Sequence, residues 1–410
     1  MGKKILCNIP CGWNVAKVED IFYVLRGVTF PKSAKSEKAD SYIGCLRTAN
    51  VQQKVDWNDL WKIPEAYLTD EDKIVKEHDI LISVANSLNL LGKSSYVSKV
   101  HQRSTFGTFI VNLRAKVDNP LLLYYFLQTR FFLDQVKDCA STTTNISNIS
   151  TAKLKKLSVI VPPLPEQERI VAKIEELFSQ LDAAVAELKS VKEKLAIYRQ
   201  AVLKEAFEGN QQNGQQFCRI IDFADVQTGA TPLTSRSDFY GGNIPWISSG
   251  KVNEEKIYEP SDWITELAIK ETNCKIFPAH TILVAMYGEG KTRGKCAELM
   301  IAAATNQALA AIILRKDSCI IKEFLLLFLK YMYQEIRRKA VGGVQPNLNL
   351  TAVKNIEIPL FDKAKQEEIV MLIDEKLSIC NNIEQTVNTA LQQAAALRQS
   401  ILKRAFEGNL

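Results

Sequence analysis

The sequence is poor in the residues from which metal and catalytic sites are commonly built. It has three histidines, His78, His101 and His280, in 410 residues, too few to favour a metal cluster or a triad built on histidine. Its nine cysteines are an odd number at scattered spacings, with one close pair, Cys7 and Cys11. Without a second pair at zinc-finger spacing, this pattern predicts reduced thiols and no bound metal.

Long apolar runs and cofactor-binding motifs are missing as well. The apolar runs, such as Phe324–Leu329, are too short to cross a bilayer, and the N-terminal residues lack a signal-peptide core, so we expect a cytoplasmic protein with no membrane contact. No GxGxxG loop follows a strand, and no NPPY-like or DPPY-like methyltransferase stretch occurs. Lys93 and Lys291 stand in P-loop-like endings, but the required leading glycine is Ser87 in one and Ala285 in the other. The sequence therefore predicts neither a catalytic residue nor a cofactor of its own.

Charge and composition give weaker indications. Lysine and arginine exceed aspartate and glutamate by 52 to 46, a net charge of +6 that only tilts the interpretation towards an anionic partner. A hydrophobic fraction of 46% is typical of a globular protein, and 410 residues suffice for two or more domains.

The most informative feature is a long heptad stretch, residues 167 to 207, that occurs twice. Gln167 returns 199 residues later as Gln366, and Ala206–Asn210 returns as Ala405–Asn409. Each copy predicts a helix of roughly 60 Å with a narrow apolar seam. The predicted seam residues are Ile170, Ile174, Leu177, Leu181, Leu188, Leu195, Ile369, Ile373, Ile383, Val387 and Leu397. Two copies in one chain favour pairing with each other over a dimerisation coiled coil, which remains the alternative.

The segments before the two helices are related too. Val24 and Gly27 match Val226 and Gly229, and the strand-like Ile80–Ile82 matches Ile282–Val284. Short strands followed by a helical stretch indicate a mixed domain. We predict an α+β fold with a pseudo-twofold repeat: globular domains at 1–160 and 211–358, and long antiparallel coiled-coil helices at 161–210 and 359–410.

Several polar and basic loops are candidates for DNA contact, because glycine-rich basic loops suit phosphates, and hydroxyl, amide and guanidinium groups suit base edges. All of them are also ordinary loop residues, and that alternative stays open. The candidates are Arg47, Asn50, Lys93, Arg236, Ser248, Ser249, Lys251, Lys291, Arg293 and Lys295.

These features together resemble one family, the DNA specificity subunit of type I restriction-modification systems. The stretch VPPLPEQERIVAKIEELFSQLDAAV from Val161 and the ending ILKRAFEGNL from Ile401 are similar to its two repeated regions. The stretch from Gly229, GATPLTSRSDFYGGNIPWISSGKV, is similar to the start of a target recognition domain. The resemblance covers essentially the whole chain, but AKQEEI from Ala364 replaces the proline-rich entry of the first repeat.

The resemblance implies a subunit without catalytic activity. Each recognition domain would read one half of a split, asymmetric target in double-stranded DNA, and the helix pair would set the gap. The helices would dock two methyltransferase subunits carrying S-adenosylmethionine, joined by motor-endonuclease subunits, with ATP and Mg also on the partners. Because the helices are alike while the domains diverge, this predicts nearly symmetric docking, except where the altered entry at Ala364 weakens it.

Two alternatives stay open at this point. One is a coiled-coil scaffold whose domains bind proteins and have no DNA affinity. The other, a stand-alone nuclease or methyltransferase, is disfavoured by the missing motifs.

Overall fold

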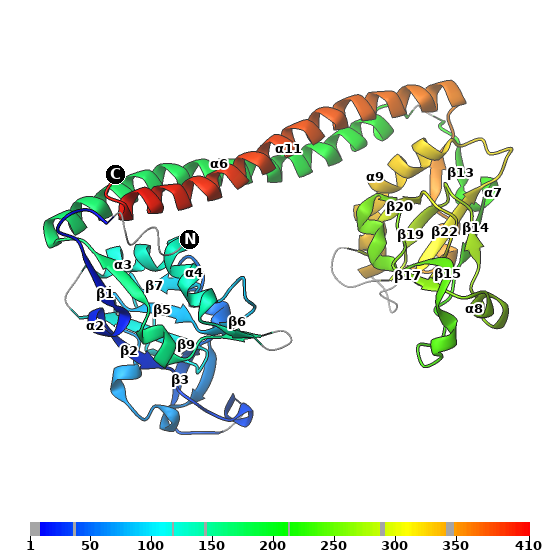
Figure 1. Cartoon of the computed structure of the whole chain (residues 1–410). Helices are drawn as coiled ribbons and strands as arrows, with labels where there is room; N and C mark the ends of the chain where they lie inside the picture. Colours follow the sequence, from blue (N-terminus) through cyan, green and yellow to red (C-terminus); the bar gives the residue numbers. More distant parts are fainter. Residues whose placement is uncertain are drawn as a thin grey trace. The chain divides into compact units, whose positions relative to one another are not determined.

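The computed structural model describes residues 9–35, 38–116, 119–142, 146–211, 214–287, 292–341 and 348–410. The chain divides into two compact units, unit 1 (Met1–Lys189 and Asn388–Leu410) and unit 2 (Ser190–Val387). Each contains an α/β body and part of both long helices, α6 (Leu164–Glu208) and α11 (Lys363–Phe406), drawn in Figure 1. The units therefore combine segments from distant parts of the sequence.

Unit 1 is built on two main sheets. The first is antiparallel, in the order β2 (Phe22–Arg26), β9 (Ile110–Ala115), β5 (Ile80–Ser83), β7 (Ser94–Tyr96). In the second, β3 (Tyr42–Leu46) lies antiparallel to β4 (Trp61–Pro64) and parallel to β8 (Ser104–Phe106). The smaller strands are β1 (Asn14–Lys17) with β12 (Ser158–Val161), and β10 (Ser141–Thr142), β11 (Ser147–Asn148) and β6 (Ala85–Asn86). The short helices are α2 (Val18–Ile21), α3 (Pro120–Leu127), α4 (Arg130–Asp138) and α5 (Thr151–Lys155), with 3-10 turns at Lys32–Lys35, Thr48–Asn50, Glu65–Tyr67 and Glu71–Lys73.

Unit 2 repeats this plan. Its first sheet runs β14 (Ala224–Thr228), β22 (Leu309–Leu314), β19 (Ile282–Ala285), β20 (Cys296–Leu299), β16 (Lys256–Ile257). Its second runs β17 (Asp262–Ile264), β15 (Tyr240–Ile247), β21 (Ala303–Thr305), β18 (Ile276–Phe277), and β13 (Phe217–Arg219) pairs with β23 (Glu357–Pro359). Its helices are α7 (Ile220–Phe223), α8 (Glu266–Glu271), α9 (Lys322–Val341) and α10 (Leu350–Lys354), with 3-10 turns at Ser237–Phe239 and Ser249–Glu254. The shared order of the first four strands confirms the predicted internal repeat.

The central strands are buried on both faces. In β5, Ile80 and Ile82 pack with the helices, while Leu81 packs with Leu46 and Phe106 of the second sheet. Strand alternation places successive side chains in different cores, which explains why the run is continuously apolar. The matched glycines Gly27 and Gly229 also have a physical reason, because a Cβ at either would overlap a backbone carbonyl of the neighbouring segment.

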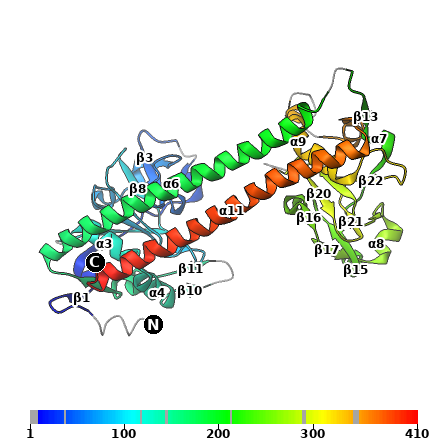
Figure 2. The same ribbon diagram turned by 90° about the horizontal axis from the view of Figure 1, so that it is seen from above.

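The two long helices run antiparallel within each unit. In unit 1 the end of α11 lies beside the start of α6 (Figures 1 and 2), and Arg398 pairs with Asp182 at 2.6 Å. In unit 2, Lys376 stands where the first repeat has Leu177, and it pairs with Glu205 at 3.2 Å. The predicted pairing of the two copies is confirmed in both units.

The repeated ending AFEGN anchors the helices in the domain cores. Phe406 meets Phe126 of α3 in unit 1, with ring centroids 5.1 Å apart. Its repeat partner Phe207 meets Phe324 and Phe328 of α9 in unit 2, at 5.3 and 5.2 Å. One phenylalanine per repeat thus joins a helix end to a domain, which accounts for the repetition of this segment.

The predicted seam is buried or half-buried at most of its positions, both inside and outside the domain cores. Most of the seam is buried or half-buried: Ile170, Ile174, Leu177, Leu181, Leu188, Leu195, Ile369, Ile373 and Val387. Ile383 and Leu397 are exceptions, at 40% and 51% exposure. These two positions do not fit a buried seam, because two helices alone cover only one side of a seam residue. Among the described residues, no helix is long and apolar enough to span a membrane.

Candidate nucleic-acid interface

In each unit, the loop that carries a predicted lysine contacts a second polar loop, and this contact lies at the same corner of both units. Lys93, just before β7, donates a hydrogen bond to Oε1 of Gln52, whose Nε2 donates to the carbonyl of Ala49 at 2.7 Å. Lys295, just before β20, donates to Oδ1 of Asn253 at 2.7 Å. In both units one lysine is therefore held by a side-chain amide: Gln52 follows the 3-10 turn Thr48–Asn50, and Asn253 lies within the 3-10 turn Ser249–Glu254.

The second unit repeats the whole contact. Asn253 donates from Nδ2 to the carbonyl of Gly250 at 2.8 Å, as Gln52 does to Ala49. The candidates Ser248, Ser249 and Lys251 lie in the segment that this amide joins to Lys295. Sequence spacing alone did not reveal that these two loops meet.

Arg47 and Asn50 occupy the matching segment of unit 1, but their side chains serve the loop itself. The Arg47 guanidinium pairs with the Asp59 carboxylate and donates to the Asp59 carbonyl at 3.0 Å. Asn50 is 2% exposed and donates to the carbonyls of Asp56 and Asn58, each at 3.0 Å. This placement does not fit the predicted direct contact of Asn50 with a base edge, because a buried amide with backbone partners has no group to offer DNA.

The candidates of unit 2 are also held by neighbours. Ser248 lies 2.9 Å from the Ser261 hydroxyl, and Lys251 pairs with Glu254 at 2.8 Å. Ser249, beside them, is half-buried. These residues stay candidates for DNA contact, with the charge of Lys251 already balanced.

Arg236 is a second charged candidate of unit 2 with a described ion pair. Its side chain is more exposed than that of Lys251. Its guanidinium holds Asp238 in two hydrogen bonds, at 2.8 and 2.6 Å, and lies 3.2 Å from Glu271. Bonding to Asp238 raises the pKa of Arg236 above its usual range. Arg293 is half-buried in the turn before β20, and Lys291 lies outside the described residues.

A second polar corner of unit 2 was not among the sequence candidates. Thr231 donates to Oε1 of Gln307 at 2.5 Å, and Lys275 donates to Oε1 of Gln227 at 3.1 Å. Thr231, Lys275 and Gln307 are exposed. The equivalent corner of unit 1 carries Phe109, which is also exposed. The signal in the sequence was the pair of loops that follow β14 and β21, next to the matched glycine.

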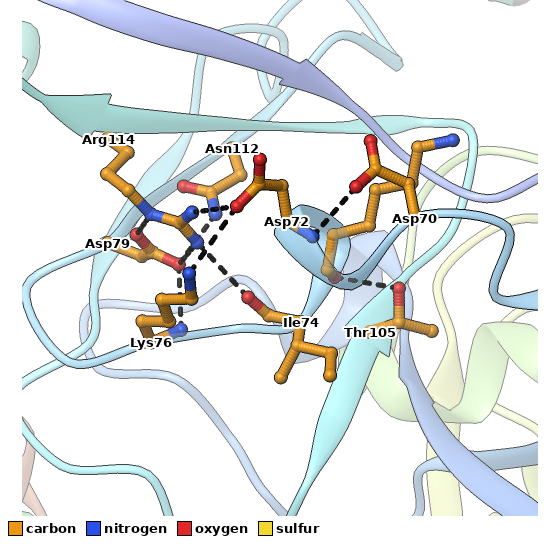
Figure 3. A network of polar contacts seen from close by, with 9 residues as sticks. Asp70, Asp72, Ile74, Lys76, Asp79, Thr105, Asn112 and Arg114 are labelled. Atoms are coloured by element: carbon orange, nitrogen blue, oxygen red, sulfur yellow. Dashed lines mark hydrogen bonds and ion pairs between the residues drawn. The ribbon is translucent and has the colours of Figure 1, made fainter.

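Each unit supports its loops with a buried polar network of its own. In unit 1 (Figure 3), Arg114 binds both oxygens of Asp79 at 2.7 and 2.9 Å and the carbonyl of Ile74 at 3.1 Å. Asn112 adds a bond to Asp79 at 2.6 Å, and Asp79 also accepts from the Lys76 amide at 2.8 Å. The network ties the loop at residues 70–76 to β5 and β9, and the hydrogen bond with Asp79 raises the pKa of Arg114.

In unit 2 the network centres on Glu298 of β20. This carboxylate accepts from Lys322 at 2.6 Å and contacts Nδ1 of His280 at 2.8 Å, with its side chain 6% exposed. Burial acts to raise the pKa of Glu298, but the hydrogen bonds from Lys322 and His280 outweigh it, so the pKa lies below its ordinary value.

The described residues offer no group of three or more histidine, cysteine or acidic side chains that could hold a metal. The cysteines described are free thiols, and burial raises the pKa of Cys45 and Cys296 to about 12. These two thiols are therefore protonated at neutral pH and weak as nucleophiles.

A cleft of about 620 Å³ in unit 1 lies between the Lys93 turn and the helix pair. Cations line it from four elements: Lys93, Lys137, Lys189 and Arg398. Arg398 is paired with Asp182, and the remaining wall is largely apolar, with Leu133, Leu181 and Leu391.

The fold and these corners define an internally duplicated α+β protein that carries two divergent polar corners on a pair of long helices. The chain belongs to the family of type I restriction-modification DNA specificity subunits, because the family model for the type I restriction modification DNA specificity domain matches it twice, at residues 10–193 and 213–393.

Known proteins of this kind are similar along nearly the whole chain. The specificity subunit of the type I restriction enzyme StySPI from Salmonella potsdam is 27% identical over 98% of this chain and 90% of its own length. That of EcoKI from Escherichia coli K12 is 26% identical, with the same coverage. A solved chain, described with complex assembly and conformational transition of the type I R-M system, has the same fold, with a TM-score of 0.73, 18% identity and coverage of 98% and 99%.

Proposed function

We propose that each unit reads one half of a bipartite, asymmetric target in double-stranded DNA. The observation that carries this proposal is the duplicated fold with one lysine-bearing corner per unit, where the same backbone plan presents different side chains. Lysine suits phosphate, and the hydroxyl and amide groups around it suit base edges. Two copies with different corners favour two different half-sites.

The helix pair sets the gap between the half-sites in this proposal. Helix α6 continues without interruption for 45 residues and contributes to both units, as do the 44 residues of α11. A helix lengthens by about 1.5 Å per residue, so the number of residues in an uninterrupted helix fixes its length.

Leu181→Pro tests the helix pair directly. Leu181 is half-buried within α6. Proline there removes a helix hydrogen bond and clashes with the preceding turn, at about 3 kcal/mol or more. We expect lost assembly or an altered target gap with unchanged half-site sequences, measured by methylation mapping, while Leu181→Ala keeps the gap. An unchanged gap and assembly with proline would argue against the spacer role.

The helix pair also docks the partners, two methyltransferase subunits with S-adenosylmethionine and then motor-endonuclease subunits that use ATP and Mg. Its surface supports this, because Ile197, Met371 and Ile379 are exposed at 71%, 67% and 57%. Large apolar side chains exposed on a helix pair are available for contacts with another protein. The chain itself supplies specificity and no catalysis.

A genome-wide map of adenine methylation, with the gene intact, deleted and restored, tests the proposal. We expect methylation at one split, asymmetric motif to vanish on deletion and to return on complementation. The scaffold alternative predicts no such motif and no salt-sensitive mobility shift of the purified complex with duplex DNA.

A further inference from the structure

Two glutamines occupy the same position in the two repeats and are buried at the start of the long helices. Gln167 lies in the first turn of α6 and Gln366 in the first turn of α11. Their exposures are 1% and 0%, low for a residue type that is usually at the surface.

In unit 1 the amide of Gln167 joins three segments. Its Oε1 accepts from the backbone N–H of Asn119 at 3.0 Å, and its Nε2 donates to the carbonyl of Pro162 at 2.9 Å. Asn119 is the N-cap of α3 and accepts from Leu121 and Leu122. One amide thus connects α6, the link from β12 and the cap of the helix that covers the main sheet.

In unit 2 the arrangement returns with different residues. Oε1 of Gln366 accepts from the N–H of Ile321 at 2.9 Å, at the residue before α9 begins. Its Nε2 donates to the carbonyls of Phe361 and Cys319, both at 2.8 Å. The same three segments are joined, although the side chains around the amide differ.

We infer that Gln167 and Gln366 are positioning residues that fix the angle of each recognition domain on its long helix, and thereby the gap of the DNA target. The inference rests on the proposed function. The amide is planar and binds backbone groups that cannot rotate away, so it restrains both the distance and the direction between helix and domain. Apolar packing between a long helix and its domain, as between Phe406 and Phe126, is less directional.

The test uses the complete chain assembled with its methyltransferase subunits, on duplexes that carry the mapped target with its native gap or a gap one base pair shorter or longer. Gln167→Met keeps the length of the side chain and removes the hydrogen bonds to Asn119 and Pro162. We expect the preference for the native gap over the altered gaps to fall about fivefold or more, the factor for about one net hydrogen bond. Half-site base preferences stay unchanged, and Gln366→Met acts likewise.

Gln135→Met is the matched control. Gln135 also makes two backbone bonds, accepting from the N–H of Ser158 at 2.9 Å and donating to its carbonyl at 3.1 Å, but it joins α4 to β12 inside the domain. We expect lower thermal stability with an unchanged gap preference. Gln366→Met, at the matching position of unit 2, is the second variant if Gln167→Met does not fold.

The outcomes separate the inference from the function on which it rests. A folded, assembled Gln167→Met or Gln366→Met complex with the wild-type gap preference overturns the inference. An equal loss in Gln135→Met also overturns it, because the effect would then be one of general stability. A wild-type complex that methylates no bipartite target would instead refute the proposed function.

Discussion

The two units keep one backbone plan while exchanging the buried polar groups that support it. His78 and His280 sit before the central strand of each main sheet in the same left-handed conformation, with φ 69° in both. Their amides donate to matching carbonyls, of Val97 at 2.7 Å and Leu299 at 2.6 Å. The turn is thus retained although the contacts of the two imidazoles differ.

The side chains next to that turn are not retained. Ile80 pairs with Leu113 and Ile282 with Ile312, so the Asp79, Asn112 and Arg114 network of unit 1 corresponds to Thr281, Ala311 and Ile313 in unit 2. Conversely, Glu298 corresponds to Tyr96, since these residues pair with Ile282 and Ile80. The strand pattern therefore specifies this fold, while the buried polar network next to the turn differs between the units.

Asp79→Ala should have the largest effect and should separate the units. It removes the shared partner of the half-buried Arg114 guanidinium and the buried Asn112 amide, at a cost of up to about 3–5 kcal/mol, the cost of breaking a buried pair. Thr281→Ala, at the matching place, should cost about 1 kcal/mol. Thermal denaturation of the full chain measures both.

A triple exchange tests whether unit 1 can fold with the residues of unit 2. Asp79→Thr with Asn112→Ala and Arg114→Ile places the residues of unit 2 into unit 1. Removing all members of a buried network together leaves no orphaned charge, so we expect the triple variant to be more stable than Asp79→Ala. A triple variant less stable than the single one would show that the loop at residues 70–76 needs this network to fold.

Glu298→Gln tests the network of unit 2 through pH. Because the folded pKa of Glu298 lies below its ordinary value of 4.5, its contribution is fully present above that value and is lost as the pH falls through the folded pKa. At pH 7 we expect a loss of about 1.5–3 kcal/mol, typical of a charged hydrogen bond. Towards pH 3 the difference from wild type should shrink in hydrogen exchange of unit 2.

The control is Glu254→Gln, which removes an exposed carboxylate paired with Lys251 in the same unit. It should change stability by less than about 1 kcal/mol. A difference between Glu298→Gln and wild type that is constant from pH 3 to 7 would contradict the assigned role of the charge.

The repeat, the long helices and the family could be predicted from the sequence, because they depend on periodicity and on residues matched along the chain. The burial of Asn50 and the ion pairs of Arg236 could not be predicted, because such contacts depend on neighbours that spacing does not show. In the sequence, Gln167 was only a residue that matches Gln366 in the repeat. Its role required the distances from its amide to Asn119 and Pro162.

The parts of the helix pair in the two units differ in their exposed apolar residues, although nearly symmetric docking was predicted. Ile379 and Leu372, exposed in unit 2, correspond by the 199-residue repeat to Gln180 and Lys173 in unit 1. We expect Ile379→Gln to weaken the binding of one of the two proposed methyltransferase subunits by about tenfold, because burying an isoleucine contributes about 1.5–3 kcal/mol. Native mass spectrometry during titration measures both sites, and Gln180→Ile should strengthen the other. Equal effects on both subunits would restore the symmetric prediction.

Lys295→Ala and Lys93→Ala form the smallest and most specific test, because the two lysines make the same contact in different units. Each should weaken DNA binding by the complex several-fold and reduce its salt slope by about one, as expected for one lost phosphate contact. Lys295→Ala should also alter selection in the half-site read by unit 2 alone, and Lys93→Ala in the other, when both are measured on a randomised target library. Because each lysine also holds an amide, Asn253→Ala is needed beside Lys295→Ala: it removes the amide and leaves the cation. If Asn253→Ala keeps the wild-type salt slope while Lys295→Ala lowers it, the cation contacts DNA. The same salt slope in both variants would mean that Lys295 only supports its loop.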